Sequence, residues 1–427
     1  LGLGLAQARV ETVLLTGVTL ILTFALGARL FNAWVGAVAV GLLVLVRWTG
    51  LTYVQLTGTP LVDLARIARY DPLVPVLGLA ALHVYLWARA SARAWLYAAA
   101  GVLAGLCGLA HVYGLFWVPA LVVLSIWDRG RGAATGAIVV GAVLPWLPYA
   151  AYVLSDLPDW RGQTAIYAPR VELLNPAWYL ANLLQEYHRY GPGLGPPGPG
   201  WLLRPGFWLM VVALPLSLFG LVRRAVACDP AARAIVVPAL LFPMLFALTI
   251  TLKLVNYTLI ELPIFAVAVG WGFVQFWRAS AWSKPLLGVI GAAALIEGGV
   301  ALAHLEQAAA TTTPYPTFVA EVAQYVPPGA RVLGLHSYWI GLQDHDYSSF
   351  LVPLNFADVG VPLDRALDQV DPDVVLLDAR MRAYFESPLA ASDGALFRAW
   401  LASHDAQLVG SVDDPTYGLM EIYRVNR

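Results

Sequence analysis

Long apolar runs, separated by short polar turns, dominate the chain up to about residue 303. A helix needs about 20 mostly apolar residues to cross a bilayer, so each run is a candidate membrane segment. We predict ten or eleven such segments. They lie at residues 12–28, 33–47, 50–64, 72–88, 95–110, 112–127, 134–153, 206–222, 234–252, 258–277 and 285–303. The run at 50–64 is the weakest, because Gln55, Pro60 and Asp63 interrupt it, and the stretch 95–127 must be divided by a turn at 111–114.

The pattern changes after residue 303, where short apolar stretches alternate with polar ones as in a water-soluble domain. We expect strands at 330–335, 373–380, 406–412 and 419–425, and helices at 316–326, 361–370 and 393–403. This order predicts an α/β domain over residues 304–427, after a transmembrane domain over 1–303. No glycine-rich phosphate loop follows any of these strands, so we predict no nucleotide site in this domain.

A long polar stretch at 154–204 separates the seventh candidate segment, 134–153, from the eighth, 206–222. Within it, residues 176–190 have the pattern of an amphipathic helix with aromatic side chains suited to a membrane interface. A turn-rich Gly/Pro run follows. The stretch could form a lid over a site or simply pack as a loop, and both alternatives stay open.

Composition supports the membrane interpretation. The 427 residues are 59% hydrophobic and only 12% charged, and the mean hydropathy is +0.68. The formal net charge is −1, so the chain lacks the basic excess typical of nucleic-acid binding. Cys107 and Cys228 lie in or beside apolar runs, which favours structural thiols over a disulfide or a metal site. The bilayer is therefore the first partner, and we expect a multi-pass protein of the cell membrane.

Arginines predict the orientation, because Arg and Lys collect in cytoplasmic loops. Residues 89–93, 129–131, 223–233 and 278–284 carry them and alternate consistently along the chain, so all four can be placed inside. The remaining polar segments then lie outside. They are residues 66–71, 111–113, 154–204, 253–257 and everything after about 304. The C-terminal domain is accordingly predicted to be extracytoplasmic.

Ionisable and polar residues gather at this predicted outer face. Such residues are costly near a membrane unless they are paired or wet, which makes them functional candidates. They are Arg66, Arg69, Asp71, His111, Tyr113, Lys253, Tyr257 and Glu261.

Lys253 stands out among them, because only two of the 26 Lys and Arg residues, Lys253 and Lys284, are lysines. A compact ammonium group suits a phosphate or pyrophosphate oxygen. The alternative is that Lys253 merely reaches from the end of a membrane segment to the interface.

The stretch ARIARYDP at 65–72 allows two interpretations. Asp71 before Pro72 is typical of a helix N-cap with proline at the first helical position. The same carboxylate could instead serve as a catalytic acid or base at the mouth of a cavity. Arg66 and Arg69 are three residues apart, so on one helical face they could clamp an anion together, or one of them could pair with Asp63.

His111 and Tyr113 fall in the tight turn of the 95–127 stretch, where a histidine is either an interfacial hydrogen-bonding residue or part of a site. Glu11 precedes the first apolar run and is either a second acidic group or a helix-start charge. These residues define no metal-ligand set, and a divalent metal ion stays an open possibility. No HExxH, GxSxG, CxxC or Walker sequence occurs, so protease, hydrolase and NTPase functions lack support.

The chain resembles the GT-C superfamily of integral-membrane glycosyltransferases, which use polyprenyl-phosphate sugars and include protein O-mannosyltransferases and aminoarabinose transferases. The resemblance rests on four segments in a shared order. They are ALGARLFNAWVGAVAVGLLVL (25–45), PLVDLARIARYDPLVPVLGLAAL (60–82), LYAAAGVLAGLCGLAHVYGLFWVPAL (96–121) and KLVNYTLIELPIFAVAVGWG (253–272).

This resemblance implies transfer of a sugar from a polyprenyl-phosphate donor to an unknown glycan, lipid or protein acceptor at the outer membrane face. It assigns catalytic positions to Asp71, the second-loop acid, and to Glu11. It assigns Lys253 to the cation before a late segment and His111 to the polar turn of a Gly/Leu-rich hairpin. The chain opens LGLGLAQARVE, without an initiator Met, so we expect the family's first span and acidic first outer loop to precede Leu1.

Two other classes of protein remain as alternatives. A membrane transporter or lipid flippase would also place charges among apolar segments, although such proteins usually show two related halves and no internal repeat is visible here. A non-catalytic membrane scaffold is the other. Convergence of the outer charges in one place would favour the enzyme, whereas a polar path at mid-depth would favour transport.

Overall fold

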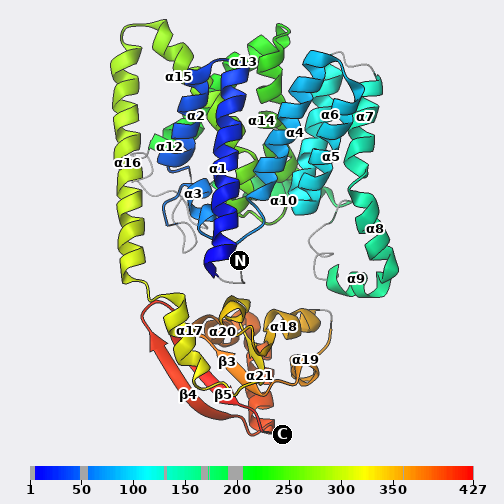
Figure 1. Cartoon of the computed structure of the whole chain (residues 1–427), viewed down its shortest axis with the longest axis vertical. Helices are drawn as coiled ribbons and strands as arrows, with labels where there is room; N and C mark the ends of the chain where they lie inside the picture. Colours follow the sequence, from blue (N-terminus) through cyan, green and yellow to red (C-terminus); the bar gives the residue numbers. More distant parts are fainter. Residues whose placement is uncertain are drawn as a thin grey trace. The chain divides into compact units, whose positions relative to one another are not determined.

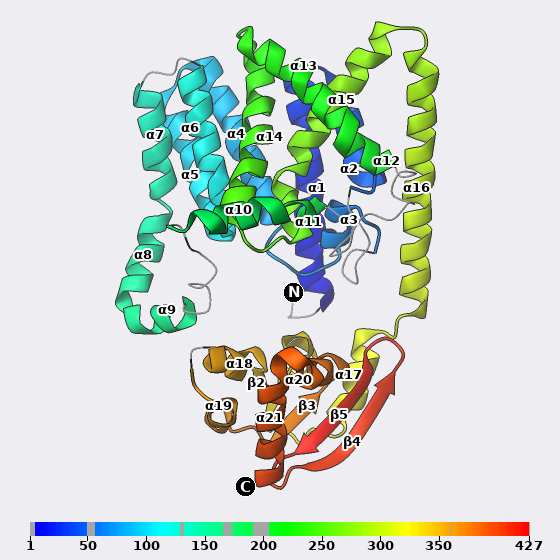
Figure 2. The same ribbon diagram turned by 180° about the vertical axis from the view of Figure 1, so that it is seen from behind.

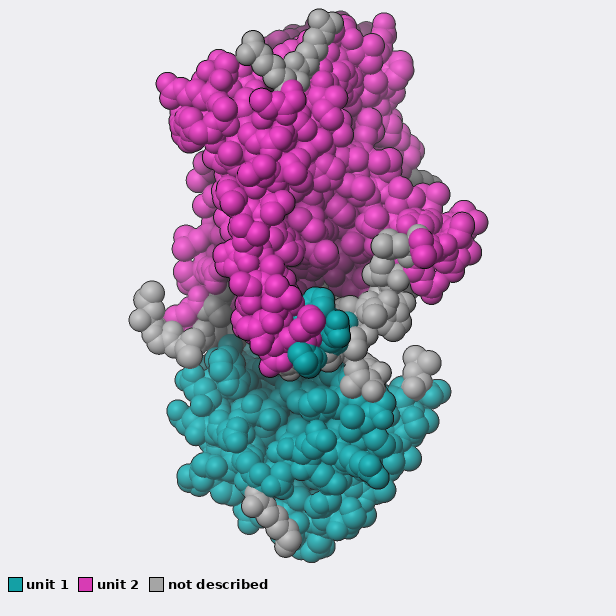
Figure 3. Space-filling view, turned by 90° about the vertical axis from the view of Figure 1, so that its right-hand side faces the viewer, with its two compact units in different colours: residues 1–5, 158–169, 307–427 teal, residues 6–157, 170–306 magenta. Residues whose placement is uncertain are grey.

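The computed structural model describes residues 5–48, 56–128, 132–164, 172, 174–190, 205–358 and 360–426. The chain forms two compact units (Figure 3). The helical unit contains residues 6–157 and 170–306, and the C-terminal unit contains residues 307–427 together with 1–5 and 158–169.

Among the described residues, seven helices are long and apolar enough to cross a membrane, judged by length and composition (Figure 1). Their elements are α1 (Leu5–Leu30), α4 (Leu73–Ser91), α7 with α8 (Gly132–Val143, Trp146–Ser155), η4 with α13 (Leu209–Ala213, Leu214–Val226), α14 (Pro230–Thr249), α15 (Leu262–Ala279) and α16 (Ser283–Thr311), the last continuing into α17 (Tyr315–Ala323). Three shorter apolar helical segments join them: α2 (Ala33–Leu45), α5 (Ala94–Ala110), and η1 with α6 (Val112–Phe116, Trp117–Trp127).

Seven long and three shorter apolar segments bear out the predicted polytopic helical architecture. One predicted segment, 50–64, is wrong. Its described part contains only bends and the six-residue helix α3 (Pro60–Ala65), while residues 49–55 lie outside the described residues. The polar and proline positions that weakened this run are the physical reason. The 95–127 stretch divides at His111, as predicted.

Close helix packing in the helical unit depends on glycine at the contact between α5 and α7. A Cβ atom on Gly105 would overlap the carbonyl oxygen of Ala142, and one on Gly141 would overlap that of Ala98. Helices without a hydrophobic drive between them associate through such small residues, because the backbones can then approach closely.

Polar residues begin several helices. The Asn32 side chain accepts from the backbone N–H of Val35 at the start of α2. Asp229 caps α14 and is followed by Pro230, and Asn175 in the same way precedes Pro176 at the start of α10 (Pro176–Gln185). These caps satisfy backbone donors that have no partner inside the helix.

Elements from the predicted outer segments 154–204 and 253–257 lie at one end of the helical unit, together with α3. In Figures 1 and 2, α3, α10 and α11 (Tyr187–Tyr190) lie at the lower end of this unit, and the turns α13–α14 and α15–α16 lie at its upper end. The segment η5 (Val255–Ile260) packs against α3, α4 and α11. Three stretches far apart in sequence, α3 with α4, α11 and η5, therefore meet at this end.

The C-terminal unit contains a five-stranded mixed sheet in the order β2-β1-β3-β5-β4. The strands are β1 (Arg331–Gly334), β2 (Asp346–Ser349), β3 (Val374–Leu377), β4 (Gln407–Asp414) and β5 (Gly418–Arg424). β1 pairs in parallel with β2 and β3, whereas β5 pairs antiparallel with β3 and β4. The helices after α17 are α18 (Leu351–Asp358), α19 (Leu363–Val370), α20 (Ala379–Glu386) and α21 (Ala391–Ser403).

All four strands and all three helices predicted for this unit form. The edge strand β2 was not predicted, because its sequence DYSS is polar and lies half-buried rather than in the core. The helices α18 and α20 were also missed. Asp378 begins α20 by accepting from the N–H of Met381, and it also accepts from the hydroxyl of Tyr338.

Candidate functional site

The site begins at the turn between α5 and α6. The N–H of His111 donates to the carbonyl of Cys107 at 3.1 Å, and that of Gly114 donates to His111 at 2.7 Å. A Cβ atom on Gly114 would overlap the carbonyl oxygen of Cys107, so only glycine fits this turn. The tight turn holds His111 and Tyr113 close together.

Four rings from three segments form an aromatic cluster, consisting of Tyr70, His111, Tyr113 and Tyr257. The His111 ring centre lies 4.1 Å from that of Tyr113, 4.9 Å from Tyr257 and 5.6 Å from Tyr70. Among the described residues, the buried Nδ1 of His111 has no hydrogen-bond partner. Burial lowers the pKa of His111 below its usual 6.5, so the ring is neutral near pH 7.

Asp71 lies beside this cluster, with no exposed surface. Nε of Arg69 donates to its Oδ2 at 2.6 Å, and the Tyr113 hydroxyl faces its Oδ1 at 3.4 Å. The prediction that Asp71 caps the following helix is wrong: Pro72 occupies the N-cap of α4, and no side chain caps that helix. The carboxylate is already engaged by the guanidinium group.

Arg66 points elsewhere. Its Nη1 lies 3.7 Å from Oδ1 of Asp63, whose Oδ1 also accepts from the N–H of Thr57 and whose Oδ2 accepts from the N–H of Gly58. Helix α3 ends at Ala65, so Arg66 and Arg69 do not share a helical face, and the predicted common clamp is wrong. The pairing with Asp63 is the alternative that the structure supports.

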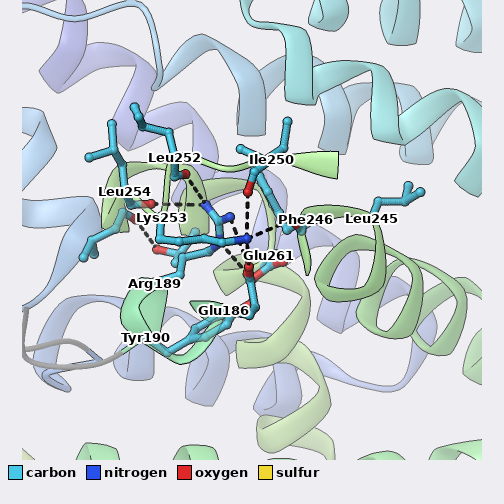
Figure 4. A network of polar contacts seen from close by, with 12 residues as sticks. Glu186, Arg189, Tyr190, Leu245, Phe246, Ile250, Leu252, Lys253, Leu254 and Glu261 are labelled. Atoms are coloured by element: carbon cyan, nitrogen blue, oxygen red, sulfur yellow. Dashed lines mark hydrogen bonds and ion pairs between the residues drawn. The ribbon is translucent and has the colours of Figure 1, made fainter. Parts of the chain in front are cut away.

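Lys253 is turned into the protein (Figure 4). Its side chain is 6% exposed, and Nζ donates to Oε2 of Glu186 at 2.7 Å and to the carbonyl of Ile250 at 2.7 Å. Burial lowers the pKa of Lys253 below 10.5, and the hydrogen bond to Glu186 opposes that shift. A lysine that merely reached toward the interface would not be held by a buried carboxylate in this way.

Arg189 shares the same carboxylate. Its Nε donates to Oε1 of Glu186 at 2.5 Å, and its Nη1 faces the carbonyls of Leu252 and Leu254 at 3.4 and 3.5 Å (Figure 4). The Arg189 side chain is completely buried. One carboxylate thus serves two cations, Lys253 and Arg189. Burial raises the pKa of the neighbouring Glu261 to about 8, so this carboxyl group is mostly neutral near pH 7 and the cation pair retains one positive charge.

Arg189 and Tyr257 join the cation pair to the aromatic cluster. The Arg189 guanidinium carbon lies 4.2 Å from the ring centre of Phe246 and 5.8 Å from that of Tyr257. Nearby, the Tyr190 hydroxyl donates to Oε2 of Glu261 at 2.7 Å (Figure 4). The two groups therefore form one continuous region, at the end of the helical unit where α3, α11 and η5 meet.

The structure brings seven of the nine candidate residues together. They are Arg69, Asp71, His111, Tyr113, Lys253, Tyr257 and Glu261. Arg66 pairs with Asp63 outside this group. Glu11 is exposed on α1 and makes no hydrogen bond or ion pair with any described residue.

Sequence reasoning missed Glu186 and Arg189, because residues 176–190 were interpreted as a surface helix. Tyr190, predicted to lie at the membrane interface, is instead hydrogen-bonded to a buried carboxylate. The spacing of Glu186 and Arg189, three apart beside Tyr190, was the available signal. Within the part of the chain that the structure describes, no three His, Cys, Asp or Glu residues lie close enough to hold a metal ion.

The fold and site define a class: a polytopic helical membrane protein with a small C-terminal α/β unit and a cationic, aromatic site at one end of its helices. Its fold is similar to that of ArnT from Cupriavidus metallidurans, in a crystal structure bound to undecaprenyl phosphate. The similarity has a TM-score of 0.57 and covers 98% of this chain and 83% of that chain, at 14% sequence identity. No protein-family model matches the chain, and no curated protein sequence matches it significantly. The chain thus shares its fold with ArnT.

Proposed function

We propose that this chain is a membrane glycosyltransferase that moves a sugar from a polyprenyl-phosphate donor to an acceptor at the outer face of the membrane. The observation that carries the proposal is the buried cation pair, Lys253 and Arg189, with one positive charge to spare beside an aromatic cluster. It lies in a fold shared with ArnT, whose crystal structure holds a lipid phosphate of the proposed donor class.

The proposed reaction needs cations at the donor phosphate. The bond between the anomeric carbon and the phosphate oxygen breaks, and its electron pair stays on the phosphate. The acceptor oxygen bonds to the anomeric carbon and gives up its proton to a base or to water. Lys253 and Arg189 would stabilise the negative charge that grows on the leaving phosphate, with most effect in a buried site. Lys253 can turn to the phosphate from Glu186, its present partner.

The neighbouring residues would position the sugar. The free Nδ1 of neutral His111 can exchange a hydrogen bond with a sugar or acceptor hydroxyl. Asp71 touches Arg69 and Tyr113, so we propose that it acts through them as a positioning residue, in place of the direct catalytic role predicted from sequence. Arg66 and Glu11 lie outside the group and have no part in this proposal.

The proposed orientation follows the arginines. The α4–α5, α13–α14 and α15–α16 turns carry exposed arginines such as Arg93, Arg223 and Arg278, and cytoplasmic loops are rich in such residues. The site lies at the other end of the same helices, which would face outward. The C-terminal unit follows α16 and would also be extracytoplasmic.

The first test is binding of undecaprenyl phosphate to the purified protein in detergent. Lys253→Ala removes a charge-assisted hydrogen bond worth about 1.5–3 kcal/mol, so Kd should rise roughly 10- to 100-fold. Lys253→Arg should restore part of the affinity. The matched control is Arg93→Ala, which removes an exposed cation from the opposite end of the helices and should leave Kd unchanged.

Unchanged binding by a folded Lys253→Ala protein would contradict the proposed phosphate site. Sugar transfer should fall in parallel with binding when a polyprenyl-phosphate sugar is the donor. A protein that binds undecaprenyl phosphate and moves it across a vesicle membrane, yet transfers no sugar, would support the alternative of a lipid flippase.

A further inference from the structure

A second site lies at the end of the helical unit opposite the cation pair. There a cavity of about 900 Å³ opens between α2, α15 and α16. The side chains that matter are Trp34, Phe273, Trp277, Arg278, Lys284 and Leu287. Most of the wall is apolar, and both charged residues are cations.

Apolar lining also occurs farther along α16. A second cavity, of about 340 Å³, shares Phe273 with the first and is lined by Val289, Ile290 and Ala293 of α16 and by Trp208. Lys284 and Ala293 are nine residues apart on this helix, so the two cavities together extend roughly 14 Å along it. This shape suits a charged group at one end and a hydrocarbon chain behind it.

Helix α16 has little protein packed against it along this groove. It approaches α2 closely where Gly298 meets Leu45, and Glu297 lies 4.0 Å from Arg47 near the same point. Between this contact and the α15–α16 turn, Val289 is 67% exposed. Apolar side chains that the protein leaves uncovered favour an apolar ligand such as a hydrocarbon chain, because an empty cavity loses van der Waals contacts.

The larger cavity, lined by Arg278 and Lys284, has the charge to bind an anion. Neither Arg278 nor Lys284 forms an ion pair with an acidic side chain anywhere in the described chain. Trp34 and Trp277 line the same cavity, and tryptophan is enriched where a membrane meets water. Basic pockets between membrane helices on the cytoplasmic side bind anionic lipid head groups.

We propose that this groove binds an anionic glycerophospholipid, with the phosphate at Arg278 and Lys284 and an acyl chain along Val289, Ile290 and Ala293. The lipid would tie α16 to α15 and so support the helix that leads into the C-terminal unit. This site is separate from the proposed donor site, which lies at the other end of the helices around Lys253.

Native mass spectrometry of the full chain in non-ionic detergent tests the proposal, with phosphatidylglycerol and phosphatidylcholine of identical acyl chains as probes. The protein should bind phosphatidylglycerol roughly 30-fold more tightly, because the two cations attract an anionic head group and not a zwitterionic one. The double variant Arg278→Gln/Lys284→Gln should lose this preference. The matched control Arg93→Gln/Arg223→Gln removes two exposed cations from the same end outside the groove and should keep it.

Equal binding of the two phospholipids by the unaltered protein would overturn the proposal, as would a preference that survives in the Arg278→Gln/Lys284→Gln protein. Ala293→Trp, which fills the groove, should weaken binding of both lipids. If undecaprenyl phosphate displaces phosphatidylglycerol from this groove, the occupant is a polyprenyl lipid and the proposal fails. None of these outcomes depends on Lys253, so the donor site and the groove are tested separately.

Discussion

Arg69 and Asp71 are unequal partners in their ion pair. Asp71 has no exposed surface, whereas one third of the Arg69 side chain reaches solvent. Removal of one partner leaves the other uncompensated, and the cost depends on how well water can replace the missing charge. Loss of the partner of the more deeply buried group, Asp71, therefore costs more stability than loss of the partner of Arg69.

We predict that Arg69→Gln destabilises the protein more than Asp71→Asn does. The first change strands a buried carboxylate and should cost about 3–5 kcal/mol. The second leaves a partly solvated guanidinium and should cost about 1–2 kcal/mol. Denaturant unfolding in one detergent measures both, and the reverse order would contradict the assigned burial. Arg69→Leu/Asp71→Leu, which removes both charges, should recover part of the loss.

The burial of His111 predicts that the stability of the protein depends on pH. Burial lowers the pKa of His111 in the folded protein, so as the pH falls through about 6.5 the unfolded chain binds a proton at this residue before the folded protein does. This contribution to stability is complete above pH 6.5 and is lost as the pH falls below that value. Acidification from about pH 7 to pH 5 should therefore destabilise the protein less in His111→Gln than in the unaltered chain. Equal losses measured by thermal unfolding would show that His111 is not buried as a neutral ring.

Among the elements, the α5–α7 contact and the α5–η1 turn set the geometry of the site. Gly105 lets α5 approach α7, and Gly114 lets the chain reverse tightly enough to place His111 beside Tyr113. Neither glycine touches a charged residue of the site. The two glycines instead fix the position of α5, the helix that ends just before His111.

A pair of glycine variants tests this packing. Gly105→Ala would push a methyl group into the backbone of α7 and should destabilise the protein by about 1–3 kcal/mol. Gly136→Ala on α7 meets open space, so the same change there should stabilise the helix by up to about 1 kcal/mol. Equal effects on the free energy of unfolding would contradict the close approach of the two helices.

The membrane helices could be predicted from the sequence, whereas the contacts between segments distant in sequence could not. The helices α4, α14 and α15 can each be recognised from one apolar run long enough to span a bilayer, because the hydrophobicity of a segment is a local property of its sequence. The short helix α11 carries no such signal, and its Glu186 and Arg189 acquire a role only when η5 brings Lys253 to them. Sequence reasoning selected Lys253 because it is one of two lysines, but the local pattern could not reveal its partners.

At the scale of the whole molecule, arginine placement predicted that residues 154–204 and 253–257 share an end, and η5 accordingly packs against α11. The fold agrees with that of ArnT at only 14% identity, so the family pattern matched few individual residues. Arg66 and Glu11 show the difference. Arg66 was a candidate because of its charge and Glu11 because of the family pattern, and neither lies in the group around Tyr257.

The most direct test of the central claim is a cryo-electron microscopy structure of the full chain with undecaprenyl phosphate. The account predicts the phosphate within about 2.7–3.2 Å of Nζ of Lys253 or of the Arg189 guanidinium, with the Glu186 carboxylate turned from Lys253 to make room. A phosphate bound only at Arg278 and Lys284, or a Lys253–Glu186 pair left undisturbed at saturating lipid, would contradict it.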